Sequence, residues 1–411
     1  MRRIRVLGLV AVFLALAASA WAVGWNRYPD VTGLPSGKQV KGGGGITTMS
    51  DEVFLAPGDN TLDFMKFSNG AWTALKSVPQ GPRKKMVKKG AWLVTAVGRV
   101  YLFKGGGTDE FYEYDPARDN WNRLTGPGFR KGVKGGFATV VNFSGKPYIY
   151  AGSGSNTNEW KRFNLTTMAW EAATPFSLPV MRAKDGSCLV ADAGGIIYFL
   201  NGNGANEFYA ANLTQPEPVW EAKAYLPIPV PGQNGRKKVK EGGCIEDLGG
   251  TIYAVKGGST REFWSYLPPD DAWSYIGEVG ATDAAIKGIK CGRSLAAGVK
   301  GIYCIIGNNT SEFWYYSLLD EMGQMPSVAT GATAPRASAM RLTPNPARGG
   351  TGILCSLPIG RTATLEVRNS LGQVVFRATR EDGRFLIPNL AAGVYTLSAS
   401  GPSQEKLVVL K

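Results

Sequence analysis

The chain has 411 residues, with 54 glycines, 24 prolines, five cysteines, no histidine and a formal net charge of +14. Charged residues make up 19% and aromatic residues 11% of the chain, a composition too apolar and too aromatic for a disordered protein. Without histidine the chain cannot form a Ser–His or Cys–His catalytic pair, a His-ligated metal site or an imidazole pH switch. We predict no metal site, no cofactor and no catalytic residue.

Residues 1–22 have the pattern of a secretory signal peptide. Three arginines precede an apolar run over residues 6–18, and Ala20 and Ala22 frame a small-residue cleavage site. No later stretch approaches the ~20 apolar residues that a membrane-spanning helix needs. We therefore expect an exported chain, located outside the cell or on the outer-membrane surface after removal of the signal peptide, with no transmembrane segment.

A short acidic–aromatic segment recurs six times, usually after a β-like run and a glycine-rich turn. Its acidic residues, about 50 positions apart, are Asp63, Glu110, Glu159, Glu207, Glu262 and Glu312. Tryptophans recur at the same interval, at Trp25, Trp72, Trp121, Trp170, Trp220 and Trp273. Trp25 has no acidic segment before it and Glu312 has no tryptophan after it, so the two incomplete ends add up to one complete unit. This arrangement predicts a closed ring in which the N-terminal strand completes the last unit, leaving no long unpaired sheet edge.

Each unit contains four short β-like runs separated by Gly, Asn, Asp and Pro turns. In the second unit we expect strands near residues 91–97, 99–104, 110–115 and 120–124. Four strands in each of six units predict an all-β fold, a six-bladed β-propeller over residues 23–326. The cysteines lie in strand-like runs without the clustered spacing of a disulfide framework, which favours buried, unpaired thiols.

The second unit also resembles the kelch repeat family. The resemblance rests on residues 100–103, the Gly105–Gly106 pair, residues 111–116 and Trp121. It extends over residues 24–320, with degenerate copies such as residues 201–204 in the fourth unit, and it implies a kelch-like propeller. Kelch-like copper oxidases need histidine ligands, which this chain lacks.

Each unit opens with a lysine: Lys41, Lys88, Lys134, Lys184, Lys240 and Lys287. The innermost strand of a propeller blade lines the central channel, and its start lies on the same face as the second turn. We therefore expect the six lysines and the six acidic residues near one channel mouth. In one interpretation each lysine pairs with an acidic residue and both serve the fold. In the other, the lysines form a ligand-binding channel mouth for anions, because further Lys and Arg residues precede them.

The composition changes after residue 326, where residues 327–340 form a linker rich in small residues. Residues 341–411 contain short strand-like runs and resemble the type A sorting domain of the bacterial type IX secretion system. The residues that carry this resemblance are Pro344, Asn345, Pro346, residues 369–374, Gly393 and Tyr395 within residues 390–395, and residues 406–411. The resemblance implies a small Ig-like β-sandwich and export by the type IX secretion machinery. An ordinary Ig-like accessory domain is the alternative.

These features favour a secreted or cell-surface propeller that binds a ligand, either an anionic glycan or a surface protein. An extracellular glycan-acting hydrolase or lyase that uses acidic residues is one alternative, and a structural surface spacer is another. An active site should break the repeat symmetry with one odd carboxylate, and we identify none in the sequence. A moderate charge and an exported location argue against nucleic acid as a partner.

Overall fold

The computed structural model describes residues 24–317, except 131–132, 144–145, 173–176, 229, 231–236, 282, 284 and 300. Beyond them it describes residues 341–343, 347–348, 353–356, 363–368, 373–380, 384–387, 393–399 and 404–410. The chain divides into two compact units, Met1–Ser327 and Val328–Lys411. The predicted signal peptide, the predicted linker and the sorting residues Pro344, Asn345 and Pro346 lie outside the described residues.

The first unit consists of six four-stranded antiparallel sheets, the blades of a propeller. Blade 1 contains β2 (Gly45–Met49), β3 (Glu52–Ala56), β4 (Met65–Ser68) and β5 (Ala71–Ala74). Blade 2 contains β6 (Trp92–Ala96), β7 (Arg99–Phe103), β8 (Phe111–Asp115) and β9 (Asn120–Leu124). Blade 3 contains β10 (Phe137–Phe143), β11 (Lys146–Gly152), β12 (Trp160–Asn164) and β13 (Ala169–Ala172).

The second half of the ring repeats this arrangement. Blade 4 contains β14 (Cys188–Ala191), β15 (Ile196–Leu200), β16 (Phe208–Asn212) and β17 (Trp220–Lys223). Blade 5 contains β18 (Cys244–Leu248), β19 (Thr251–Val255), β20 (Glu262–Leu267) and β21 (Ala272–Glu278). Blade 6 contains β22 (Leu295–Ala297), β23 (Gly301–Ile305), β24 (Phe313–Ser317) and β1 (Gly24–Tyr28). The all-β, six-bladed propeller predicted from the repeat is thus confirmed, and among the described residues its only helix is the 3-10 turn η1 (Pro268–Asp270).

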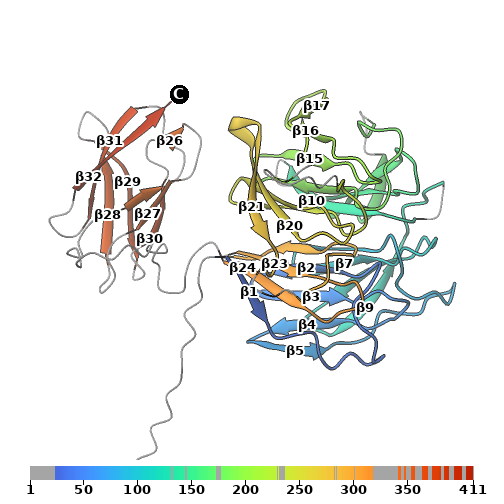
Figure 1. Ribbon diagram of the computed structural model, residues 1–411. Helices are drawn as coiled ribbons and strands as arrows, with labels where there is room; N and C mark the ends of the chain where they lie inside the picture. The colour runs from blue at the N-terminus through green and yellow to red at the C-terminus, as the bar shows by residue number, and fades with distance from the viewer. Residues whose placement is uncertain are drawn as a thin grey trace, which may run out of the picture. The chain divides into compact units, whose positions relative to one another are not determined.

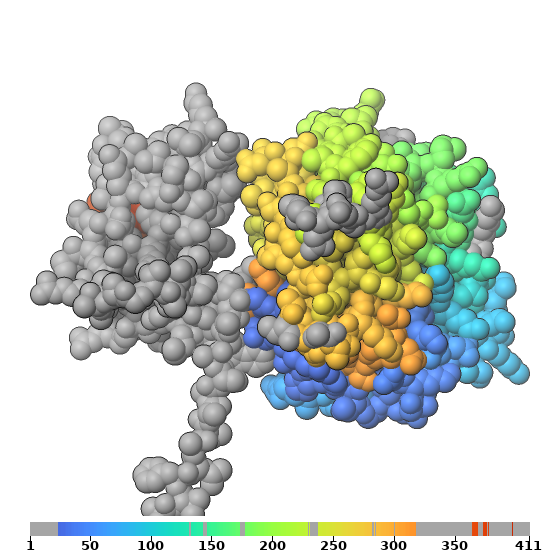
Figure 2. Space-filling view, viewed as in Figure 1, coloured from blue at the N-terminus to red at the C-terminus, as the bar shows by residue number. Residues whose placement is uncertain are grey.

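The N-terminal strand is the outer strand of the last blade. β1 pairs antiparallel with β24 over five residue pairs, from Gly24 opposite Ser317 to Tyr28 opposite Phe313. Blue β1 and orange β24 therefore lie side by side in Figure 1, and blue and orange surfaces adjoin in Figure 2. This pairing gives the last unit the fourth strand that the sequence places at the other end of the repeat.

The first strand of each blade packs beside the first strands of its neighbours and lines the central channel. Outside this inner ring, aromatic and aliphatic residues of facing sheets form the core between blades. The repeated tryptophans of blades 1 to 5 add a regular contact, because the indole N–H of each donates to a backbone carbonyl that follows the outer strand of the preceding blade. These bonds, 2.7–3.0 Å long, join Trp72 to Pro29, Trp121 to Lys76, Trp170 to Thr125, Trp220 to Ser177 and Trp273 to Ala224.

The second unit contains two sheets in its described segments. β25 (Arg341–Thr343), β27 (Ile353–Ser356) and β30 (Arg384–Ile387) form one sheet. β26 (Ala347–Arg348), β32 (Gln404–Leu410), β31 (Gly393–Ala399), β28 (Ala363–Arg368) and β29 (Val374–Arg380) form the other. Of the sorting residues, Gly393 and Tyr395 lie on β31, opposite Val409 and Leu407 of β32.

Four cysteines of the propeller, Cys188, Cys244, Cys291 and Cys304, are buried free thiols. No helix among the described residues is long and apolar enough to cross a membrane.

Candidate functional site

The repeated lysines lie where the entry loop of each blade meets the inner strand. In blade 2 the backbone N–H of Lys88 donates to the carbonyl of Lys104 at 3.1 Å, and in blade 5 that of Lys240 donates to Lys256 at 3.0 Å. All inner strands start from the same face of the propeller, as the parallel contact between neighbouring blades 6 and 1 shows. The lysines at their starts therefore share one face.

The sixth repeat position is held by Lys290 and not by Lys287. The Lys290 N–H donates to the carbonyl of Ile306 at 3.0 Å, the bond that defines this position in other blades. Lys287 lies three residues earlier on the exposed loop, where its Nζ donates to the Asn309 carbonyl at 3.5 Å. The sequence contains two Ile–Lys pairs three residues apart, 286–287 and 289–290, and the glycine after the first pair made it the closer match to the repeat.

The lysines at these six positions are largely unpaired. Lys41 forms an ion pair with Asp59 at 3.6 Å. In the part of the propeller that the structure describes, the side chains of the other five make no hydrogen bond or ion pair, and four of them are exposed; these five are Lys88, Lys134, Lys184, Lys240 and Lys290. Pairing between these lysines and the repeated acidic residues is therefore not found there.

The entry loops add more exposed basic residues to the same face. Together with the six lysines at the repeat positions they form a set that we call the basic face. The added members are Lys38, Arg83, Lys84, Lys85, Lys89, Arg130, Arg182, Lys237, Lys238 and Lys287. Such a concentration of one charge sign raises the local concentration of anions.

We call the six repeated acidic residues the acidic ring, and three of them instead hold the entry loops of their own blades. Asp63 accepts hydrogen bonds from the backbone N–H of Ser36 at 3.1 Å and from its hydroxyl. Glu110 accepts from the N–H of Arg83 at 3.2 Å, and Glu159 accepts from that of Arg130 at 3.0 Å. These three residues thus position, through backbone hydrogen bonds, the loops that carry basic side chains.

Two of the acidic residues also pair with a buried lysine at the end of the second strand. Lys104, with no exposed surface, binds Glu110 at 2.8 Å, and Lys256 binds Glu262 in the same way. In blade 4 Asn201 takes the place of this lysine and donates to Glu207. The remaining member is Glu312 of blade 6. Burial raises the pKa of its carboxyl, although the nearby charge of Arg27 on the N-terminal strand acts in the opposite direction.

Glycines two residues after the lysine allow neighbouring blades to meet at the channel. Gly43 has a φ of +83°, and a Cβ there would lie 2.2 Å from the carbonyl carbon of Lys88 in the next blade. A Cβ on Gly186 would lie 2.0 Å from the carbonyl oxygen of Lys240. The glycines at these positions therefore allow the backbones of neighbouring blades to come into direct contact at the channel.

An ion cluster crosses the channel at this narrow level. Lys89 of blade 2 binds Asp185 of blade 4 at 2.7 Å and Glu241 of blade 5 at 3.2 Å. These groups and the surrounding glycines line a small cavity at the basic mouth. The carboxylates raise the pKa of Lys89, so its charge is retained.

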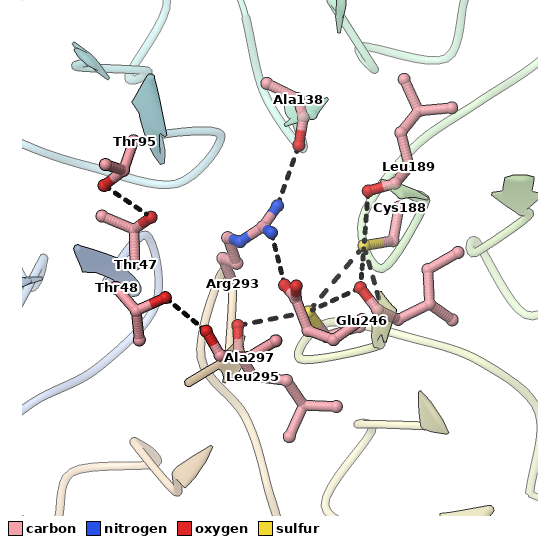
Figure 3. A network of polar contacts seen from close by, with 12 residues as sticks. Thr47, Thr48, Thr95, Ala138, Cys188, Leu189, Glu246, Arg293, Leu295 and Ala297 are labelled. Carbon is pink, nitrogen blue, oxygen red and sulfur yellow. Dashed lines mark hydrogen bonds and ion pairs between the residues drawn. The ribbon is translucent and has the colours of Figure 1, made fainter. Parts of the chain in front are cut away.

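A second ion pair crosses the channel deeper inside. Arg293 extends from the start of the inner strand of blade 6, donates to the carbonyl of Ala138 in blade 3 at 2.9 Å and pairs with Glu246 of blade 5 (Figure 3). Burial raises the pKa of Glu246 to about 8, although the Arg293 charge acts in the opposite direction. Burial and the nearby Asp192 raise the pKa of Asp247 to about 6.

Glu246 is the odd carboxylate that the sequence analysis did not identify. The corresponding inner-strand residues of the other blades are Thr47, Val94, Thr139, Val190 and Ala296, all uncharged. The sequence signal that could have found the site is a charged residue, Glu246, within the inner strand of blade 5. Its partner, Arg293, comes just before the inner strand of blade 6. None of the repeated lysines or acidic residues lines the small cavity at the basic mouth or the cavity around Arg293 and Glu246.

Among the described residues, no group of three or more His, Cys, Asp or Glu side chains is arranged to hold a metal ion.

No protein-family model matches the chain, and no curated protein is similar to it. Among solved structures, that of YjhT is 14% identical with a TM-score of 0.50, over 71% of this chain and 95% of that one. A protein of unknown function from Bacteroides thetaiotaomicron is 15% identical with a TM-score of 0.50, over 72% of this chain and 76% of that one. PorZ, a surface component of the type-IX secretion system of Porphyromonas gingivalis, is 13% identical with a TM-score of 0.40, over 90% of this chain and 51% of that one. The first two similarities support the propeller fold and nothing beyond it.

Proposed function

We propose that this chain is an exported, kelch-like propeller that binds an anionic glycan on its basic face. The observation that carries the proposal is the set of lysines around the channel mouth, five of which have no hydrogen-bond or ion-pair partner among the described residues, together with the basic entry loops beside them. A structural role would be expected to give these lysines partners, as it does for Lys104 and Lys256. An extended polyanion fits a ring of exposed cations better than a small ligand does, because the charges are spread over six blades.

The acidic ring argues against the hydrolase alternative in its original form. Glu110 and Asp63 are almost fully buried, and each holds backbone N–H groups of an entry loop. Carboxylates with these fixed partners are poorly placed to act as a general acid and base on a glycan. A spacer function would leave the concentration of charge on one face unexplained.

Binding to polygalacturonate tests the proposal, with neutral dextran as the control polymer. A variant with Lys88→Ala, Lys134→Ala and Lys240→Ala should bind polygalacturonate about tenfold more weakly or worse, because several modest charge contacts are lost together. Binding by the parent protein should weaken with salt, since exposed charges are screened. Thermal unfolding should be nearly unchanged, because the three side chains make no hydrogen bond or ion pair with the residues that the structure describes.

The matched control removes three positive charges from the opposite face, with Arg99→Ala, Arg118→Ala and Lys146→Ala. These residues lie at the starts of second strands or in the turn after β8. The control variant should bind polygalacturonate like the parent. Equal weakening by both triple variants would show that total charge and not the basic face matters, and unchanged binding by the first variant would refute the proposal.

The export part of the proposal rests on the C-terminal unit, which we propose to be an Ig-like sorting domain recognised by the type IX secretion machinery. Deleting residues 341–411 should leave the propeller in the periplasm of a bacterium that has this secretion system. The measurement is the distribution of the protein between periplasm and medium. Export without these residues would refute the assignment and leave the binding proposal intact.

A further inference from the structure

The channel holds its larger cavity at the end away from the basic face. This cavity has a volume of about 190 Å³ and is lined by two successive residues from each inner strand, together with Arg293. The first residue of each pair forms a deeper tier and is buried, and the second forms an outer tier and is half-buried. The cavity therefore opens at the ends of the inner strands. The outer tier consists of Thr48, Thr95, Val140, Ala191, Asp247 and Ala297.

Two ion-paired side chains cross the channel between this cavity and the basic mouth. Arg293 spans the channel from blade 6 to Ala138 of the opposite blade 3. Nearer the basic face, Lys89 spans it toward Asp185 and Glu241. The cavity is therefore a pocket with a polar floor, and a ligand in it would enter from the face opposite the lysines.

The floor of this pocket contains buried polar atoms that the described residues do not satisfy. The Nε–H of Arg293 makes no hydrogen bond there, because Arg293 reaches the Glu246 carboxylate through an amino group of its guanidinium instead. The hydroxyl of Thr139, a residue only 4% exposed, also makes no hydrogen bond within the described part. Buried polar groups in proteins are nearly always hydrogen-bonded, so such exceptions point to a missing partner.

The fold itself does not require these charges. At the inner-strand position equivalent to Glu246, four other blades have Thr or Val, and blade 6 has Ala296. Taking an arginine and a glutamate out of water costs free energy, and apolar residues of similar volume often serve stability as well. Positions that depart from the local rule without a gain for the fold are expected at functional sites.

The arrangement of charge selects an uncharged ligand. The guanidinium charge of Arg293 is already compensated within the lining, by Glu246 at the floor and by Asp247 at the half-buried rim, so a further buried charge would lack a counter-ion of its own. A polyhydroxylated molecule can accept from the Arg293 Nε–H, donate to the Glu246 carboxylate and exchange a hydrogen bond with Thr139, because hydroxyls both donate and accept. The side chains of Val94, Val190 and Ala296 supply apolar surface beside these groups.

The size of the pocket limits the ligand to one ring. An apolar cavity of about 150 Å³ holds a benzene molecule, so this cavity has room for a six-membered ring with small substituents. We propose that the pocket binds a single neutral, polyhydroxylated six-membered ring, either a free monosaccharide or cyclic polyol, or the end of a neutral glycan chain. This inference does not rest on the proposed function, because the pocket and the basic face lie at opposite ends of the channel.

Saturation-transfer NMR and calorimetry with the full chain test this site. The probes are glucose, galactose, mannose, N-acetylglucosamine and myo-inositol, with glucuronate and glucosamine as charged comparisons. At least one neutral probe should bind more tightly than either charged sugar. Thr139→Val should weaken its binding about five- to tenfold, because one hydrogen bond is lost without a change of shape. Ala191→Trp, at the half-buried rim, should abolish binding by filling the entrance.

The matched control is Thr73→Val, which makes the same change on the exposed outer strand β5 of blade 1. It should leave binding unchanged, and all three variants should unfold near the parent temperature. Matching oligosaccharides distinguish the two sources of the ring: tighter binding than the monosaccharide indicates a chain end, and no binding indicates a free sugar. Failure of every neutral probe, preference for a charged sugar, or binding that survives Ala191→Trp would overturn the inference.

Discussion

Blades 2 and 6 share one backbone pattern and differ in what their side chains do. In both, the residue after the second strand donates its N–H to the carbonyl of the repeated glutamate, from Lys104 to Glu110 at 3.1 Å and from Ile306 to Glu312 at 3.2 Å. In blade 2 the Lys104 side chain also binds the Glu110 carboxylate, and in blade 6 an isoleucine leaves one oxygen of Glu312 without a hydrogen-bond partner among the described residues. The repeat therefore specifies the backbone hydrogen bonds of each blade. Whether the repeated glutamate also has a charged partner depends on the side chain that its own blade supplies.

Blade 6 also departs from blade 2 at the channel and at its outer edge. It contributes Arg293 to the channel, and it receives its fourth strand from the N-terminal segment. The indole N–H of Trp25 on that strand is buried and makes no hydrogen bond among the described residues, unlike the indole N–H of the equivalent Trp121 in blade 2. Function is thus expected where blades 5 and 6 break the repeat, and stability where blade 2 obeys it.

The largest effect should come from changing blade 2 toward blade 6 with Lys104→Met. Lys104 is fully buried and also donates to the carbonyls of Pro79 at 3.0 Å and Gln80 at 2.7 Å. Removing it leaves the Glu110 carboxylate buried without its counter-ion, which costs about 3–5 kcal/mol of the free energy of unfolding. Denaturant unfolding measures the loss.

The double variant Lys104→Met, Glu110→Leu sharpens this test. It should be less destabilised than the sum of its two single variants, because the two residues interact directly. Ile306→Met in blade 6 makes a similar apolar change without touching a charge and should cost about 1 kcal/mol or less. A loss for Lys104→Met as small as that of Ile306→Met would contradict the distinction between the two blades.

The propeller could be derived from the sequence because its signals are repeated. The spacing of the tryptophans and acidic residues gave six units, and the unmatched Trp25 pointed to a strand that belongs with the last unit. The inner-strand lysine of blade 6 could not be placed, because two Ile–Lys pairs compete and only the hydrogen bond of Lys290 to Ile306 separates them. Repetition fixes a position only where one candidate is present.

The channel pocket was missed for a related reason. Glu246 and Arg293 lie 47 residues apart and meet because blades 5 and 6 are neighbours around the axis. The repeated acidic residues follow turns, whereas the odd carboxylate Glu246 lies within the inner strand β18. The partners of the acidic ring were also unexpected, since the backbone N–H groups of Ser36 and Arg83 leave no sequence signal.

The ion pair of the channel should give the protein a pH-dependent stability that Glu246→Gln removes. The folded-state pKa of Glu246 is raised from 4.5 to about 8, so between these values the folded state holds a proton that the unfolded state has lost. Stability should therefore fall as the pH rises from about 5 to about 8, by about 1 kcal/mol for each pH unit, because the two states differ by about one bound proton. Thermal unfolding at several pH values measures this slope.

The matched control is Glu221→Gln on the outer strand of blade 4, where Lys223 lowers the pKa of the exposed carboxyl. This variant should keep the slope of the parent between about pH 5 and about pH 8, because Glu221 is ionised in both states there. Parallel pH profiles for the parent and Glu246→Gln would show that the channel carboxylate is ionised throughout this range.

The smallest predicted effect is a difference in unfolding free energy between a tryptophan that bonds to the preceding blade and Trp25, which does not. Trp273 and Trp25 are both half-buried, and the Trp273 N–H donates to the Ala224 carbonyl at 2.7 Å. Replacement by phenylalanine removes similar packing at both sites, but at Trp273 it also removes a hydrogen bond and leaves the carbonyl unsatisfied. Trp273→Phe should therefore cost about 1 kcal/mol more than Trp25→Phe in denaturant unfolding. Equal losses would mean that the indole bonds between blades contribute nothing net, and that the unsatisfied N–H of Trp25 does not weaken the closure of the ring.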